Sequence, residues 1–176
     1  MGGYRVYDDQ YPYFITSSIT FGLPLFSNPV ISEFILDNLK FLQEEREVKI
    51  FAYVIMENHL HAILQGEDLD LKVGSFKSYS ARVILDHLQE NKHTRWLKRL
   101  EEVKSPGKTD RAYQLWNSGY RPKQMLSNAI MTQKVEYIHN NPMKRGYVDK
   151  PEDWRYSSAR NYAGFPGLIP VTLFAL

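Results

Sequence analysis

The order of secondary-structure patterns along the chain predicts an α+β sandwich with an antiparallel sheet. A strand pattern comes first and a helix second, followed by two strands separated by a very short connection, and then by a helix, a strand and a final helix. Two strands joined so closely must run antiparallel. Because 176 residues is the size of one domain, we expect residues 1–176 to form a single domain, with residues 147–176 as a C-terminal tail packed on it.

Four segments are predicted to be strands from their β-branched, aromatic or continuously apolar composition. Residues 13–21 read YFITSSITF, and residues 48–56 read VKIFAYVIM, which is apolar enough for a central strand. Residues 57–66, ENHLHAILQG, form the next strand, which Gly66 ends. Residues 111–122, RAYQLWNSGYRP, are aromatic and end at a glycine and a proline, which indicates a strand followed by a turn.

The helices are predicted from apolar residues spaced three and four apart. Residues 29–47 begin with a proline, which is favoured in the first turn of a helix. Residues 123–141 form a long helix that Pro142 ends, because the residue before a proline disfavours the helical conformation. Residues 71–90 are predicted to form a helix, and residues 92–103 a second helix or its continuation. Residues 105–110, SPGKTD, are predicted to be a loop.

The composition excludes several kinds of site. The chain has no cysteine, which excludes disulfides, thiolate metal ligands and cysteine nucleophiles. It has no run of about 18 apolar residues, so no membrane span is expected. The N-terminus, MGGYRVYDDQ, lacks the basic start and apolar core of a signal peptide. We therefore expect a cytoplasmic globular protein with no membrane partner.

The charges are distributed unevenly. Residues 1–71 hold 4 Lys and Arg against 11 Asp and Glu, a net charge of −7, whereas residues 72–145 hold 15 against 6, a net charge of +9. Aromatic residues are interleaved with the cations of this basic block: Phe76, Tyr79, Trp96, Tyr113, Trp116 and Tyr120. Cations beside aromatic stacking platforms are what single-stranded nucleic acid requires. A solvated surface whose charges are balanced elsewhere in three dimensions would have the same composition.

Two histidines stand one residue apart in the strand predicted over residues 57–66. Residues two apart on a strand share a face, so His59 and His61 lie side by side. The opposite, core-facing side of this strand carries Leu60, Ala62 and Leu64. Two imidazoles at this spacing can hold one metal ion if a third ligand comes from elsewhere. The alternative is a pair of half-exposed polar side chains with no special role, and the other three histidines form no zinc-binding spacing with the pair.

The second informative stretch is KVEYIHNNPMKRG, residues 134–146. On the predicted helix, Lys134, Tyr137 and Asn141 share one face, at i, i+3 and i+7. A second face, expected to pack on the sheet, carries Met131, Val135 and Ile138. Beside a His-x-His strand and a basic block, this pattern makes Tyr137 a candidate nucleophile and Asn141 a candidate third metal ligand. A helix-surface tyrosine without a role is the alternative.

These motifs resemble those of a known superfamily. His59-Leu60-His61 matches the His-hydrophobe-His motif of the HUH endonucleases. The segment VEYIHNNPMKRGYV, residues 135–148, followed by WRYSSARNY, residues 154–162, resembles the single-tyrosine transposases of that superfamily. Within these, the branch called REP-associated tyrosine transposases is the most similar, and the resemblance extends over nearly the whole chain.

The resemblance implies a ferredoxin-like fold with the histidine pair on a central strand. It implies that Tyr137 is the nucleophile, and that a divalent metal, Mg²⁺ or Mn²⁺, is held by His59, His61 and Asn141. The implied activity is a metal-dependent endonuclease and transposase that nicks and rejoins single-stranded DNA near hairpins through a 5′-phosphotyrosine. Both a monomer and a homodimer fit this family.

Basic residues near the predicted site are candidate DNA contacts, and ordinary solubility is the alternative for each. They lie on the helix after the histidine strand, around the two ends of the tyrosine helix and beside the tyrosine: Lys72, Lys77, Arg82, Arg121, Lys123, Lys134, Lys144 and Arg145.

Other functions are also compatible with the motifs. A non-catalytic module derived from a transposase would bind hairpin DNA or RNA without cutting, a water-using metal hydrolase would form no covalent adduct, and a replication initiator or relaxase would share the tyrosine chemistry.

Overall fold

The computed structural model describes residues 6, 8–104, 112–119 and 121–175, so the loop predicted over residues 105–110 lies outside it. The strands are β1 (Tyr13–Ser18), β2 (Lys49–Ile55), β3 (His59–Gln65) and β4 (Lys123–Gln124). The helices are α1 (Pro29–Glu45), α2 (Leu69–Glu90), α3 (Thr94–Glu102), α4 (Asn128–His139), α5 (Asn141–Lys144) and α6 (Ala159–Tyr162). Short 3-10 helices lie at Thr20–Gly22, Leu25–Ser27 and Pro151–Asp153.

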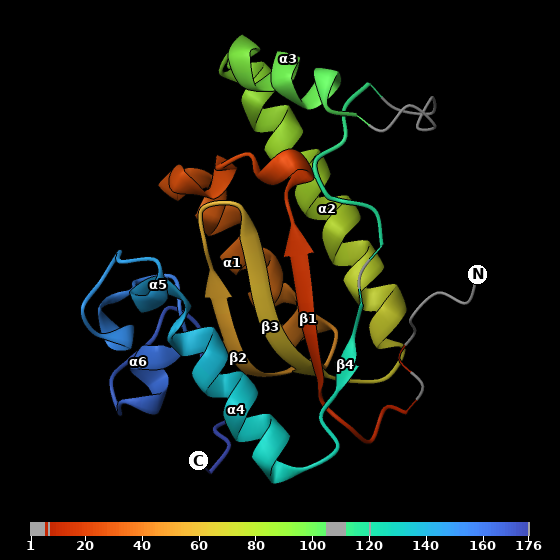
Figure 1. Cartoon of the computed structure of the whole chain (residues 1–176). Helices are drawn as coiled ribbons and strands as arrows, with labels where there is room; N and C mark the ends of the chain where they lie inside the picture. Colours follow the sequence, from red (N-terminus) through yellow and green to blue (C-terminus); the bar gives the residue numbers. More distant parts are fainter. Residues whose placement is uncertain (1–5, 7, 105–111, 120, 176) are drawn as a thin grey trace.

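The four strands form one antiparallel sheet in the order β2-β3-β1-β4 (Figure 1). The succession β1-α1-β2-β3-α2-β4 is that of a ferredoxin-like fold. This confirms the predicted α+β class and the antiparallel hairpin. Because β3 lies between β2 and β1, its side chains have a neighbouring strand on both sides.

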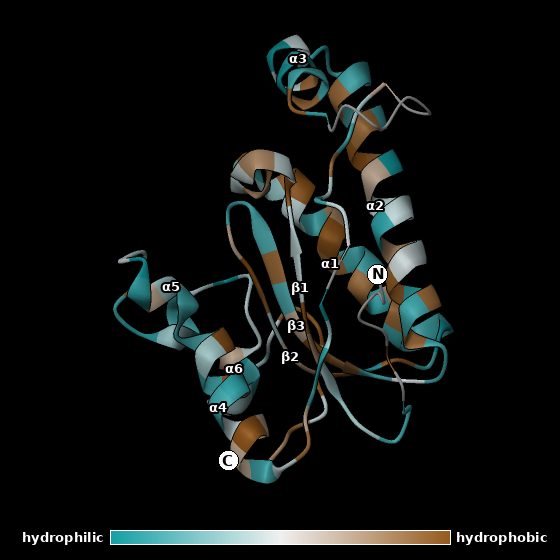
Figure 2. Ribbon diagram, turned by 45° about the vertical axis from the view of Figure 1, so that its right-hand side comes forward, coloured by the Kyte–Doolittle hydropathy of each residue, from teal (hydrophilic) through white to brown (hydrophobic). Residues whose placement is uncertain are grey.

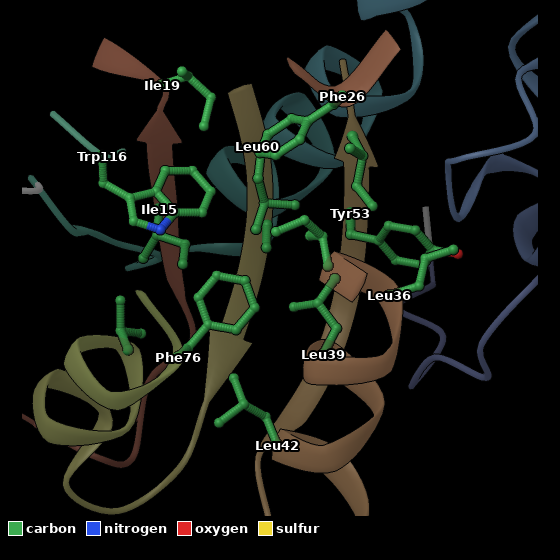
Figure 3. Close-up of a cluster of buried hydrophobic side chains, with 14 of the residues drawn as sticks. Ile15, Ile19, Phe26, Leu36, Leu39, Leu42, Tyr53, Leu60, Phe76 and Trp116 are labelled. Atoms are coloured by element: carbon green, nitrogen blue, oxygen red, sulfur yellow. The ribbon is translucent and has the colours of Figure 1, made fainter. Parts of the chain in front are cut away.

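One face of the sheet is closed by α1 and α2. Figure 3 shows Ile15 and Leu60 from the strands meeting Leu39 of α1 and Phe76 of α2. All four side chains are buried. A buried side chain of this size contributes about 1.5 to 3 kcal/mol of hydrophobic stabilisation, so this layer anchors the strands on which the histidines stand.

The opposite face is covered by α4, which Figure 1 shows in front of the sheet while α1 lies behind it. Met131, Val135 and Ile138 are buried against a second apolar cluster that includes Phe14 and Ile63. The predicted sheet-packing face of this helix is therefore confirmed. The helix that carries Tyr137 lies over the face of β3 that is not used by α1 and α2.

The tail runs along the outer edge of β2. Trp154 Nε1 donates to the backbone carbonyl of Ile55, and Ser157 forms a backbone bridge with Val54. The Ser158 amide donates to the carbonyl of Tyr53, whose own amide donates to Ser158 Oγ. These bonds satisfy β2 backbone groups that would otherwise be unpaired, and they show that the tail packs on the sheet.

The prediction of a strand over residues 111–122 is wrong. Among the residues described there, only Trp116 makes a β-bridge, to Ile19, and the strand that completes the sheet is β4 at Lys123–Gln124. Aromatic residues favoured a strand in the prediction because they pack well on pleated surfaces. In the structure Trp116 is instead buried in the core through its ring.

The helix predicted over residues 123–141 has different ends. It begins at Asn128, because the Ser127 side chain accepts a hydrogen bond from the Ile130 amide and caps the first turn. It ends at His139, and Pro142 lies in the first turn of α5. A proline there removes no helical hydrogen bond, so the chain continues past it as helix.

Within the described part of the chain, no helix has both the length and the apolar character needed to cross a membrane.

Candidate active site

His59 and His61 lie side by side on β3, with ring centroids 4.7 Å apart. The alternation of polar and apolar residues appears as teal and brown bands near the start of β3 in Figure 2. Leu60, Ala62 and Leu64 are buried in the core shared with α1 and α2, as predicted. Both imidazoles therefore project from the face of the sheet that α4 covers.

Each imidazole is oriented by a bond to its Nδ1 atom. His59 Nδ1–H donates to Asn58 Oδ1 at 2.6 Å, and the Asn58 amide group donates in turn to the carbonyl of Gly22. His61 Nδ1 lies 2.8 Å from Thr16 Oγ1 on the neighbouring strand, where β1 pairs Thr16 with His61. Nε2 of His59 therefore presents a lone pair, and Nε2 of His61 does so when its Nδ1–H donates to Thr16, which is how metal-binding histidines are usually held.

Both histidines are kept neutral. Burial lowers the pKa of His61 to about 3, and the neighbouring His59 and the Lys134 ammonium act in the same direction. Burial also lowers the pKa of His59, while nearby Glu57 opposes this shift. A neutral imidazole is the form that binds a metal ion, so no proton has to be removed from these rings at neutral pH.

Tyr137 of α4 lies directly beside this pair. Its ring centroid is 5.4 Å from that of His61 and 6.0 Å from that of Phe14. Phe14 also stacks on His61, so the three rings form one cluster. The tyrosine keeps 37% of its surface exposed, although its helix is otherwise packed on the sheet. A polymer that approaches this face can therefore reach the tyrosine, whereas His61 is buried.

Two lysines flank the Tyr137 ring. Lys134 Nζ is 5.2 Å and Lys144 Nζ is 5.6 Å from the ring centroid. Lys123 lies on the same face, because β4 pairs it directly with Phe14. Lys134 and Lys144 thus lie close to the tyrosine ring, and all three cations are on the face where they would attract a phosphate backbone.

Asn141 lies between two points at which its segment contacts the histidine strand and its turn. Four residues before it, Tyr137 contacts His61. Four residues after it, Arg145 Nη1 donates to Glu57 Oε1 at 2.9 Å, and Glu57 lies two residues before His59. Asn141 therefore lies on a segment that contacts the histidine strand and its turn at both ends.

These residues fit a divalent metal ion. Two neutral imidazoles and one amide oxygen suit Mn²⁺ or Mg²⁺ and would leave positions open for a phosphate oxygen. Across the part of the chain that the structure describes, no three residues of the His, Cys, Asp and Glu types gather into a metal site. A third protein ligand among the described residues would thus have to be of another type, such as the amide oxygen predicted for Asn141.

The remaining predicted DNA contacts lie elsewhere. Lys72, Lys77 and Arg82 are on α2, whose packing face is on the other side of the sheet. Lys77 Nζ donates to the carbonyls of Asn117 and Gly119, which gives it a structural role. Arg82 stacks over the Tyr79 ring at 5.2 Å. Lys72 lines a cavity of about 680 Å³ between α1 and α2.

Arg121 precedes β4 and is exposed. Arg145 forms an ion pair with Glu57, and its side chain is 47% exposed. Sequence reasoning alone missed Phe14, Thr16, Glu57 and Asn58. Glu57 and Asn58 directly precede the His-x-His motif in the sequence. An acid and an amide at those positions could have been predicted to contact the histidines or the residues around them. Phe14 and Thr16 required the strand register, which the sequence does not contain.

Comparison with known proteins supports the family. The chain matches the family model described as IS200-like transposase over residues 23–141. No curated protein matches it. Its structure is similar to that of a REP-associated tyrosine transposase bound to a REP hairpin, with a TM-score of 0.62, 20% identity, and coverage of 99% of this chain and 96% of the other. A candidate transposase from Deinococcus radiodurans gives a TM-score of 0.48 at 20% identity, covering 80% of this chain and 95% of the other.

The family match spans more than half of the chain and includes both the histidine pair and Tyr137. The structural match supports the same fold over almost the full length. This chain belongs to the family of IS200-like transposases.

Proposed function

We propose that the protein is a single-tyrosine transposase of the HUH type, in the REP-associated branch, that nicks and rejoins single-stranded DNA beside hairpins. The observation that carries the proposal is the contact of an exposed tyrosine with a neutral, oriented histidine pair. A module that only binds DNA would not need this combination. Hairpin DNA as the ligand is supported by the similar transposase that was solved with a REP hairpin.

The chemistry assigned to Tyr137 is a transesterification. Its hydroxyl oxygen attacks the scissile phosphorus, the bond from phosphorus to the 3′-oxygen breaks, and the tyrosine proton is lost while the leaving oxygen gains one. The products are a 5′-phosphotyrosine and a free 3′-OH. Because the phosphodiester energy is kept in the covalent link, a second 3′-OH can displace Tyr137 without ATP.

The protein side chains supply position and charge. A divalent ion bound by His59, His61 and Asn141 would polarise the phosphate. Lys134 and Lys144 lie 5.2 and 5.6 Å from the centroid of the attacking ring and would stabilise the negative charge that develops on the phosphoryl group. Phe14 holds the His61 ring by stacking, so the nucleophile and the ligands share one rigid support.

The decisive experiment is an adduct assay with single-stranded hairpin oligonucleotides labelled on the 3′ side of the nick. We expect wild-type protein with Mg²⁺ or Mn²⁺ to give a labelled band at the mass of protein plus DNA on a denaturing gel. Tyr137→Phe should abolish the band and leave DNA binding within about threefold, because only the nucleophile is removed. His59→Ala should lose the metal-dependent activity.

Tyr147→Phe is the matched control. Tyr147 is also exposed, but it stacks on Trp154 and makes no contact with the histidine pair. It should form the adduct at the wild-type rate. Cleaved DNA without an adduct would instead identify a water-using hydrolase, and binding of a broad hairpin panel without cleavage would identify a binding module.

A further inference from the structure

A single ion pair connects the segment after the tyrosine helix to the turn before the histidine strand. Arg145, directly after α5, donates from Nη1 to Glu57 Oε1 at 2.9 Å, across 88 residues of sequence. The Glu57 side chain is 17% exposed, whereas the other ion pairs of the described residues join side chains at least 44% exposed. Glu57 Oε2 is buried and has no hydrogen-bond partner among the described residues. This carboxylate is thus partly buried, with the half-exposed Arg145 as its counter-ion.

The spacing of the contacts explains what the pair does. Tyr137, Asn141 and Arg145 follow each other at four-residue steps, each a rise of about 6 Å on a helix. Glu57 lies outside β3, in the tight turn that the Met56 amide closes by donating to the carbonyl of His59. A contact at each end of the Tyr137–Arg145 segment therefore limits how far the residues between them can move relative to the histidine strand.

The path from Tyr137 to Arg145 is divided between α4, which ends at His139, and α5, which begins at Asn141. Asn140 between them has right-handed helical dihedral angles, and its amide donates to the carbonyl of Glu136. The Arg145 amide donates to the carbonyl of Asn141, so the two residues lie on adjacent turns. Holding Arg145 at Glu57 therefore restrains the short helix that carries Asn141.

We propose that Glu57 and Arg145 are positioning residues that fix the register of the Tyr137–Arg145 segment against the histidine pair of the same chain. The proposal rests on the proposed function for its catalytic consequence. It assigns Arg145 to the protein scaffold and not to the DNA, and it makes one chain sufficient to assemble Tyr137, Asn141, His59 and His61. Without the pair, Tyr137 stays anchored through α4, but the turn after it loses its only described side-chain contact with the β2–β3 turn.

The test is a set of single and paired variants: Glu57→Gln, Glu57→Ala, Arg145→Met and the swapped pair E57R/R145E. At saturating DNA and metal, we expect adduct formation by the three single variants to slow by about 10- to 100-fold, since small displacements of reacting groups have effects of that size. Affinity for DNA should stay within about threefold for the Glu57 variants, and removing a negative charge would only strengthen it. The swapped pair should recover much of the rate.

A second measurement needs neither DNA nor metal. Hydrogen exchange of the amides from Asn140 to Gly146 should accelerate at least tenfold in Glu57→Ala, while α1 exchanges as in the wild type. Arg99→Met, which breaks the exposed Arg99–Glu102 pair on α3, is the matched control and should change neither exchange in this segment nor adduct formation.

The outcomes separate the two proposals. If wild-type protein forms no adduct with any hairpin, the proposed function fails, and the exchange measurement still reports whether the pair holds the segment. If wild-type protein forms the adduct while both Glu57 variants match its rate and exchange, the positioning role is overturned. A loss in Arg145→Met that the swapped pair does not rescue, with Glu57→Ala unaffected, would assign Arg145 to the DNA.

Discussion

Thr16 shows how one hydroxyl group can orient a histidine of the candidate site. Its Oγ1 contacts His61 Nδ1, and no sequence motif marks it, because it lies 45 residues away on another strand. Partners of this kind fix the tautomer and the direction of a ligand, and their loss usually weakens metal binding. The site therefore depends on residues that share only a sheet register with the motif.

Thr16→Val should test this dependence. Valine has the shape of threonine without the hydroxyl group, so we expect the fold to persist and the affinity for Mn²⁺ to fall by about 10- to 100-fold. Calorimetric titration of the metal-free protein measures the affinity directly, and the Mn²⁺ dependence of cleavage should shift in parallel.

Thr20→Val supplies the control. Thr20 is a buried threonine in the same N-terminal region of the chain. Its hydroxyl group donates to the carbonyl of Leu115, away from the histidines. It should lower stability without altering the Mn²⁺ affinity. Equal Mn²⁺ affinity for wild type and Thr16→Val would show that Thr16 does not orient His61.

The C-terminal tail bonds to the edge strand β2 through a short segment that does not form a full strand. Ser158 is its central residue: it is fully buried, it bonds to both backbone groups of Tyr53, and its Oγ lies 2.9 Å from His139 Nε2. His139 is the last residue of α4. The same serine thus ties the β2 edge to the end of the tyrosine helix.

Ser158→Ala should destabilise the protein by about 2 kcal/mol, because it leaves the buried Tyr53 amide without its partner. That free energy corresponds to a decrease of about 4 to 8 °C in Tm for a chain of this size. Urea unfolding followed by circular dichroism measures the change.

Ser157→Ala should have a smaller effect, since Ser157 Oγ only accepts a bond from the Ala159 amide two residues on. A Ser158→Ala protein as stable as the wild type would show that the tail does not support the sheet.

The molecule has two sides with different roles. The face covered by α4 carries the histidines, Tyr137 and the lysines around it, whereas α1 and α2 fill the other face with the main core. The basic residues of the middle of the chain are divided between these sides. The uneven charge of the sequence is therefore only partly an indicator of where DNA binds.

Lys123→Ala tests whether the cations on the α4 face, and not those on the α1 and α2 side, bind the DNA. We expect weaker binding of single-stranded DNA and a shallower dependence of log K on log salt, by about 0.7 if one phosphate contact is lost. Arg82→Ala, on the far side, should change neither quantity if the strand is confined to the α4 face. Equal losses in both variants would mean that the DNA passes around the sheet edge to both faces.

Sequence reasoning predicted the features that depend on local periodicity. The side-by-side histidines and the buried stripe of Met131, Val135 and Ile138 follow from strand and helix repeats, and the structure confirms both. Features made by distant residues were out of reach. The Glu57–Arg145 pair spans 88 residues and the Ser158–Tyr53 bonds span 105. The two-residue β4 was missed because it is too short to carry an alternating pattern.

The ion pair at the end of α5 has a consequence for changes in chain length. One residue inserted between Tyr137 and Arg145, within α4 or α5, would rotate the rest of that helix by about 100° around its axis. Arg145 would then point away from Glu57, although every side chain was still present. A deletion would rotate the segment in the opposite sense with the same loss. This stretch of nine residues is therefore more sensitive to insertions and deletions than to most substitutions on its exposed side.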